Sequence, residues 1–159
     1  MHFKKMESQD LEFLNQVRNL VAKEFLHDSR TFTIEETRRW YQETNPDFYM
    51  IWKEETLIGY FRLSNFSRAN NNIYIGADIH PAHQGKGHAY QAYTMFIPKL
   101  FNMYDLHKIS LEVLATNTRA INLYKRLGFV QEGIKREEVL KDGAYVDSII
   151  MSILRNDRK

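Results

Sequence analysis

The apolar positions near the start of the chain repeat with a helical period. Ser8 is placed to cap this first helix, which we expect to continue to about Leu20. A second helix is predicted over residues 34–43, because Thr33 followed three positions later by Glu36 has the form of a capping box. The apolar residues of the first helix recur every three or four positions: Leu11, Leu14, Val17 and Val21.

The other apolar stretches are short, rich in branched and aromatic residues, and bounded by polar turns, which is the pattern of strands. A long helix is expected over 84–103, where Pro98 should cause a kink or a break, and a shorter helix should end at Gly128. This order predicts an α+β (mixed α/β) domain around a central, mainly antiparallel sheet. Strands are expected at 2–6, 47–53, 57–64, 72–80, 108–115, 130–140 and 145–154.

The composition is that of one globular domain, which we expect to span residues 1–159. Apolar residues make up 43% and charged residues 26%, and the net charge of +2 suits a small anionic ligand better than nucleic acid. The chain contains no cysteine, which excludes disulfides and a thiol nucleophile. It has no apolar run of the ~20 residues that a membrane span needs, and no apolar signal core. We therefore expect a cytoplasmic protein.

Residues 84–89, Gln-Gly-Lys-Gly-His-Ala, place two glycines between an apolar strand and a helix. The start of a helix has unpaired N–H groups and favours anions, and glycine lets a phosphate approach the main chain closely. The segment either binds a diphosphate or is a simple strand-to-helix turn. Other phosphate motifs do not fit: Tyr90 occupies the third small position of a dinucleotide fingerprint, and Lys86 is followed by Gly87 rather than Ser or Thr.

A second group of residues lies further along the chain. Asn117 and Tyr124 are seven positions apart, about two helical turns, and so share one face. With these residues the sequence resembles the GNAT acetyltransferase superfamily. The family's diphosphate motif is matched by Gln84, Gly87 and Ala89, and its later motif by Asn117, Ala120, Tyr124, Gly128 and Phe129.

The resemblance extends to the order of elements across essentially the whole chain. It implies the GNAT fold, with about seven strands and four helices, in which the fourth and fifth strands splay around coenzyme A. Within the family, the sequence is most similar to the branch of ribosomal-protein N-terminal and spermidine acetyltransferases. The segments that carry this similarity are HQGKG, LHKISLEV and GFVQEG, followed by DGAYVDSIIMSIL.

The resemblance implies acetyl-CoA as donor and a primary amine as acceptor, with direct attack in a ternary complex and no metal. Tyr124 would act as the acid that protonates the leaving thiolate, since a phenol stays protonated at pH 7. Asn117 would contact the pantetheine or would only cap its helix. The cofactor would also be held by the main chain of Ile79 and of Gln84, Gly85, Lys86, Gly87, His88 and Ala89.

The general base is left open by the sequence. Relatives often carry a glutamate where this chain has Tyr74, so the candidates are Asp78, Glu112 or water. Asp147 matches an aspartate common in this branch and is interpreted as structural. Three histidines surround the glycines but lack a defined third ligand geometry, so we expect loop residues beside the ligand and no metal. They are His80, His83 and His88.

Two functions remain open at this point. One is an N-acetyltransferase for a small amine, an amino sugar nucleotide or a protein N-terminus; the other is a non-catalytic acyl-CoA-binding module that keeps the fold. Tyr124 favours the enzyme. We expect no nucleic-acid or membrane partner, and a homodimer would be consistent with the family. A sugar nucleotide would need basic residues such as Arg30, Arg38, Arg39, Arg62 or Arg68.

Overall fold

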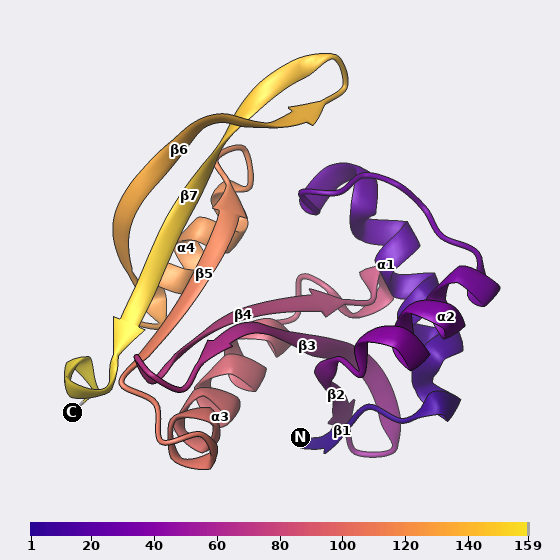
Figure 1. The fold of residues 1–159 in the computed structure, drawn as a ribbon, viewed down its shortest axis with the longest axis horizontal. Helices are drawn as coiled ribbons and strands as arrows, with labels where there is room; N and C mark the ends of the chain where they lie inside the picture. The colour runs from indigo at the N-terminus through magenta and orange to yellow at the C-terminus, as the bar shows by residue number, and fades with distance from the viewer. Residues whose placement is uncertain (159) are drawn as a thin grey trace. The chain divides into compact units, whose positions relative to one another are not determined.

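The computed structural model describes residues 1–158, which form seven strands, four α-helices and three short 3₁₀ turns (Figure 1). The predicted order of elements is confirmed, including the two N-terminal helices and the final pair of strands. Within the described residues, no helix is both long and apolar enough to cross a membrane. The α-helices are α1 (Leu11–Phe25), α2 (Ile34–Thr44), α3 (His88–Met103) and α4 (Thr118–Arg126).

The strands hydrogen-bond in the order β1-β2-β3-β4-β5-β7-β6. One neighbouring pair, β4 with β5, is parallel, and its register joins Asn72–Tyr74 to Lys108–Ser110. The pairs β1–β2, β2–β3, β5–β7 and β6–β7 are antiparallel, as predicted for a mainly antiparallel sheet. The strands are β1 (His2–Lys5), β2 (Asp47–Lys53), β3 (Thr56–Ser67), β4 (Asn72–Ile79), β5 (Lys108–Leu114), β6 (Val130–Lys141) and β7 (Ala144–Leu154).

The chain divides into two compact units. The N-terminal unit comprises Met1–Ser64 and Gly76–Ala92, and the C-terminal unit comprises Asn65–Ile75 and the chain from Tyr93 onward. Three elements, β3, β4 and α3, contribute residues to both units. The prediction of one domain and the prediction that β4 and β5 separate around coenzyme A both stay predictions.

The core of the N-terminal unit is built where the predicted apolar face of α1 meets the sheet. Helices α1 and α2 lie against each other, as Figure 1 also shows. Aromatic side chains from α2 and the strands, among them Trp40, Phe48 and Trp52, pack around this core. Burial of the apolar stripe is what stabilises α1, because helix propensity alone is marginal at this length. The buried residues of this cluster are Met6, Leu11, Leu14, Val17, Met50 and Tyr60.

The capping box predicted at the start of α2 is present. The Thr33 side chain accepts a hydrogen bond from the Glu36 N–H at 3.1 Å, and the Glu36 carboxylate accepts one from the Thr33 N–H at 2.7 Å. We expect Thr33→Ala to lower the free energy of unfolding by about 1 kcal/mol, which corresponds to a Tm lowered by roughly 2–4 °C in a chain of this size. Thermal unfolding measures this, with the exposed Thr31→Ala as the matched control. Equal melting of the two variants would contradict the cap's contribution.

The C-terminal unit contains a long hairpin, β6–β7, that lies alongside β5 (Figure 1). Its turn places Asp142 and Gly143 at φ 48° and 79°, the left-handed pair that a tight hairpin requires. A bulge interrupts β6 near Glu137. The N–H of Glu137 donates a hydrogen bond to Asp147 Oδ1 at 2.7 Å. This bond supports the structural interpretation of Asp147, which pins the register of the hairpin at the bulge.

Several details differ from the sequence prediction. Ser8 does not cap α1, because it lies in a 3₁₀ turn and the N-cap position is occupied by Asp10. Strand β3 continues to Ser67 rather than ending at residue 64. Helix α1 continues to Phe25 rather than about Leu20. Helix α3 begins at His88 rather than 84, because a 3₁₀ turn and the glycines precede it. The sequence predicts a kink or a break at Pro98; the break does not occur, since α3 runs as one helix to Met103, and the kink stays a prediction. Proline removes one helical hydrogen bond, and this loss is offset by apolar neighbours that are at most 3% exposed: Phe96, Ile97, Leu100 and Phe101.

Candidate active site

The glycine segment forms an exposed loop in the N-terminal unit that leads directly into α3. Gly85 and Gly87 have φ of 75° and 77°, a conformation that glycine adopts without steric cost. The carbonyl of Gly87 accepts the N–H of Gln91 as the first hydrogen bond of the helix. A Cβ built on Gly87 would meet no atom within 4 Å. The first N–H groups of α3 therefore begin beside open space, as an anion site needs.

Two side chains hold the loop in place. Gln84 Nε2 donates to the Ile79 carbonyl, the last residue of β4, at 2.9 Å. Lys86 Nζ donates to the Ala82 carbonyl at 3.0 Å, and this keeps its charge beside the glycines. The structure thus brings Gln84, Gly85, Lys86 and Gly87 together with Ile79. It also places His88 and Ala89 in the first turn of α3.

The three predicted loop histidines form a row next to the glycines. The rings of His80 and His83 have centroids 6.0 Å apart, and those of His83 and His88 are 6.5 Å apart. His80 Nδ1 accepts from the Ala82 N–H and caps the 3₁₀ turn Pro81–His83. Among residues 1–158, no three His, Asp or Glu side chains are grouped so that they would hold a metal ion.

These histidines predict a loss of stability in acid. Removal from water, and then the nearby lysines Lys86 and Lys53, lower the pKa of His83 and of His88. The unfolded chain therefore takes up protons first as the pH falls below about 6.5. We expect the free energy of unfolding to decrease through this range until both folded histidines are protonated. Urea titrations between pH 8 and about pH 5 measure this free energy. In the double variant His83→Gln, His88→Gln, the free energy of unfolding should depend less steeply on pH. A slope unchanged by this double substitution would contradict the assignment.

Tyr124 lies on α4 in the C-terminal unit, with 9% of its surface exposed. Its hydroxyl is 3.4 Å from the hydroxyl of Tyr93 on α3, and the two rings meet edge to face with centroids 5.6 Å apart. Phe129 also contacts the ring. Gly128, at φ 97°, ends the helix as predicted.

Asn117 is the N-cap of α4. Its Oδ1 accepts a hydrogen bond from the Ala120 N–H at 3.2 Å. The capping role that the sequence left open for Asn117 is therefore present. A contact of Asn117 with the cofactor stays a prediction.

Asp78, a candidate base, is buried in an ion pair in the N-terminal unit. Arg62 Nε lies 3.0 Å from Asp78 Oδ2, and Nη2 donates to Oδ1 across 3.4 Å. Asp78 is 5% exposed and Tyr60 is 1% exposed. Burial, followed by the neighbouring Asp78 carboxylate, raises the pKa of Tyr60 well above its usual range. The guanidinium of Arg62 lies over Gly76, where a Cβ would come within 2.7 Å of Nη2.

Glu112, the second candidate base, is also engaged by a cation. In the C-terminal unit its Oε1 accepts from Lys135 Nζ at 2.6 Å, and this hydrogen bond raises the pKa of Lys135. Tyr74 pairs with Ser110 across β4 and β5.

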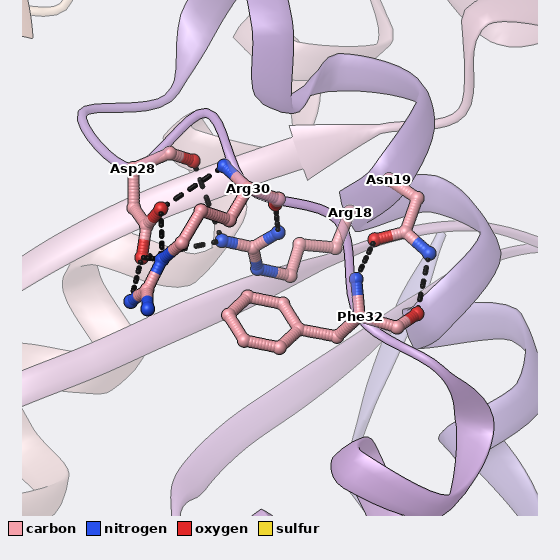
Figure 2. A network of polar contacts seen from close by, with 5 residues as sticks. All are labelled: Arg18, Asn19, Asp28, Arg30 and Phe32. Carbon is pink, nitrogen blue, oxygen red and sulfur yellow. Dashed lines mark hydrogen bonds and ion pairs between the residues drawn. The ribbon is translucent and has the colours of Figure 1, made fainter.

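The segment between α1 and α2 is held by side chains of α1, as Figure 2 shows. Arg18 donates to the carbonyls of Arg30 and Asp28 at 2.5 and 3.3 Å, and its guanidinium lies 4.4 Å from the centre of the Phe32 ring. Asn19 exchanges two hydrogen bonds with the main chain of Phe32. Arg30 pairs with Asp28 at 2.7 Å and lowers the pKa of that carboxyl to about 2.

Burial lowers the pKa of the Arg18 guanidinium, and Asp28, Tyr60 and Asp78 oppose this shift, while Arg62 adds to it. Arg18 therefore lies within electrostatic reach of the Arg62–Asp78 pair. The sequence pattern alone does not single out Arg18 or Tyr93. Each looks like an ordinary helix or strand residue, and only the fold brings it to its partners.

A family comparison gives the class of protein. Residues 14–129 match the model of the acetyltransferase (GNAT) family, well over half of the chain. The chain belongs to the GNAT acetyltransferase family, and the resemblance drawn from its motifs is confirmed.

Two individual relatives show which members of the family this chain resembles. The spermidine N(1)-acetyltransferase of Vibrio cholerae is 32% identical over 157 residues, which cover 95% of this chain and 91% of that protein. The ribosomal protein uS5-alanine N-acetyltransferase of Escherichia coli is 30% identical over 105 residues, covering 65% of this chain and 54% of that protein. Both belong to the branch predicted from the sequence.

A solved structure gives the same result for the fold. Spermidine N-acetyltransferase of Vibrio cholerae in complex with CoA and spermine superposes with a TM-score of 0.90 at 26% identity, and 98% of this chain and 96% of that chain are covered. The predicted GNAT fold is confirmed. Another structure of that enzyme, at a TM-score of 0.84 and 27% identity, is a complex with manganese ions and covers 96% of this chain and 91% of that one.

Proposed function

We propose that this acetyltransferase moves the acetyl group of acetyl-CoA to a primary amine that also bears negative charge, such as an amino sugar nucleotide. The choice of acetyl-CoA as donor rests on the loop of Gly85 and Gly87. Both glycines have a left-handed backbone, and Gly87 faces open space at the start of α3. A diphosphate approaching there would receive main-chain N–H groups and the positive end of the helix dipole. The relative that was crystallised with CoA supports the same donor.

The chemistry needs an acid and a route for the amine's proton. We assign the acid to Tyr124, whose buried phenol would protonate the CoA thiolate as the C–S bond breaks. For the base we favour water, because Asp78 and Glu112 are each held by a cation. The ammonium would then lose its proton to solvent before the amine nitrogen attacks the thioester carbonyl.

The acceptor class rests on charges in the N-terminal unit. Three guanidiniums, Arg18, Arg30 and Arg62, accompany the carboxylates Asp28 and Asp78, and Glu36 also acts on Arg30. Guanidinium groups bind phosphate and carboxylate well and repel polycations. The named relatives act on spermidine or on a ribosomal-protein alanine, and this group of charges suits neither a polyamine nor another strongly cationic acceptor.

An amine panel tests the proposal. Thiol release from acetyl-CoA is measured with spermidine, an alanine-terminated peptide, glucosamine and UDP-glucosamine. The last two present the same amine without and with a diphosphate. We expect kcat/KM for UDP-glucosamine to exceed that for glucosamine at least ~10-fold, the value of one good charged contact. A preference for spermidine would overturn the acceptor class, and acetyl-CoA binding without turnover of any amine would favour the non-catalytic module.

A further inference from the structure

The hydroxyl groups of Tyr93 and Tyr124 face each other in the buried part of the C-terminal unit. Their oxygens are 3.4 Å apart, and either can donate. Tyr93 is 1% exposed and Tyr124 9% exposed. Tyr93 belongs to none of the motifs that identify the family, and it lies on α3, six residues after Gly87.

A phenylalanine at position 93 would fill the same space with its ring. The additional hydroxyl is a buried polar group, which is costly unless it makes a useful polar contact. The hydroxyl-to-hydroxyl distance is longer than the usual O–H···O separation of about 2.7–2.8 Å, so the bond is weak while both tyrosines are neutral. A hydrogen bond to an ionised oxygen is shorter and roughly twice as strong.

We infer that Tyr93 is a positioning residue that donates a hydrogen bond to Tyr124 as Tyr124 gives up its proton. The inference rests on the proposed role of Tyr124 as the acid. In the step concerned, the amine nitrogen bonds to the acetyl carbon and the C–S bond breaks. The thiolate sulfur takes the proton of Tyr124, and the phenolate that remains is stabilised by the Tyr93 hydroxyl. The nitrogen is positively charged after its attack and releases one proton to solvent, which leaves the neutral amide. Solvent returns a proton to Tyr124 and restores the enzyme.

This arrangement has the property that a catalytic interaction requires. The Tyr93–Tyr124 hydrogen bond is weak in the resting enzyme and strengthens as negative charge develops on the Tyr124 oxygen. An interaction that is stronger in the transition state than in the ground state lowers the barrier, whereas one that is equal in both does not. The edge-to-face contact of the rings also fixes the direction of the Tyr124 hydroxyl.

The test is a double-mutant cycle of Tyr93→Phe and Tyr124→Phe. Thiol release from acetyl-CoA is followed with the fastest amine of the panel, across a pH range that includes the alkaline limb. We expect Tyr93→Phe to lower kcat about tenfold, as for loss of a hydrogen bond to a charged group, with KM for acetyl-CoA nearly unchanged. The alkaline limb should move to higher pH, since Tyr124 loses its proton less readily without the donor. In the Tyr124→Phe background, the second substitution should have no further effect.

Tyr104→Phe, which removes a hydroxyl elsewhere in the C-terminal unit, is the matched control and should leave kcat unchanged. A Tyr93→Phe enzyme with unaltered kcat and an unmoved alkaline limb would overturn the inference. An equal loss of rate in the Tyr124→Phe background would overturn it too, because Tyr93 would then act through another group. The limb position does not depend on how much enzyme is folded, so it remains informative if Tyr93→Phe is less stable.

Different outcomes would remove the role of Tyr124 as the acid and the role of Tyr93 as its hydrogen-bond donor. A Tyr124→Phe enzyme that keeps wild-type kcat would remove Tyr124 from the mechanism, and the role of Tyr93 would be lost with it. An impaired Tyr124→Phe enzyme beside a fully active Tyr93→Phe enzyme would remove the role of Tyr93 alone.

Discussion

Replacing Tyr124 by phenylalanine is expected to lower kcat at least ~10-fold while acetyl-CoA binds almost as tightly as before. The substitution keeps the ring, and with it the packing against Tyr93 and Phe129. It removes only the proton that the leaving thiolate would receive. An interaction made in the transition state affects kcat, whereas uniform binding affects KM.

Steady-state kinetics with the best amine of the panel measures this change, and calorimetry with CoA checks binding separately. Tyr104→Phe again serves as control, because it deletes a hydroxyl from a residue outside α4. If the Tyr124→Phe enzyme turned over at the wild-type rate, the thiolate would have to take its proton from elsewhere.

Gly87→Val is expected to abolish binding of CoA. At this position the backbone φ is 77°, and an added Cβ would point into open space next to the first turn of α3. A branched side chain would occupy the volume through which a diphosphate must approach the main chain. Calorimetry with CoA should show the Kd raised by at least about 100-fold, the effect of losing several charge-assisted hydrogen bonds.

Backbone strain complicates this substitution, because an L-residue at such a φ costs roughly 1–2 kcal/mol wherever it occurs. Gly143 offers a matched control in the β6–β7 turn. Its φ is 79°, and a Cβ there would likewise meet no atom within 4 Å. Gly143→Val should therefore lose similar stability and still bind CoA. Equal CoA affinity in the two variants would show that the loop does not hold the diphosphate.

The order of the elements was predictable because local signals mark it. The capping box of Thr33 and Glu36, the glycine that ends α4 and the Asp142–Gly143 turn each need only a few neighbouring residues to form. The failures came where tertiary burial outweighs a local rule. Helix α3 continues through Pro98 because the apolar residues on both sides are anchored in the core.

For the site, the sequence predicts residues that form contiguous motifs, since a loop and a helix face are local, and their roles stay predictions. It could not predict contacts between distant segments. The pairing of Arg62 with Asp78 depends on how β3 and β4 align, and that of Glu112 with Lys135 on the register around β7. Likewise, Tyr93 and Tyr124 are separated by 31 positions, so only the packing of α3 against α4 places their hydroxyls together.

The bare backbone at Gly76 has a consequence for how acceptor preference could evolve. Even a single methyl group there would come within 2.7 Å of the Arg62 guanidinium, whose flexible end can swing aside. Gly76→Ala would thus move the Arg62 guanidinium, which we propose to act on the acceptor, without changing any charge in the protein. Position 76 is therefore a natural first target for libraries in directed evolution that aim to retune this enzyme toward other amines.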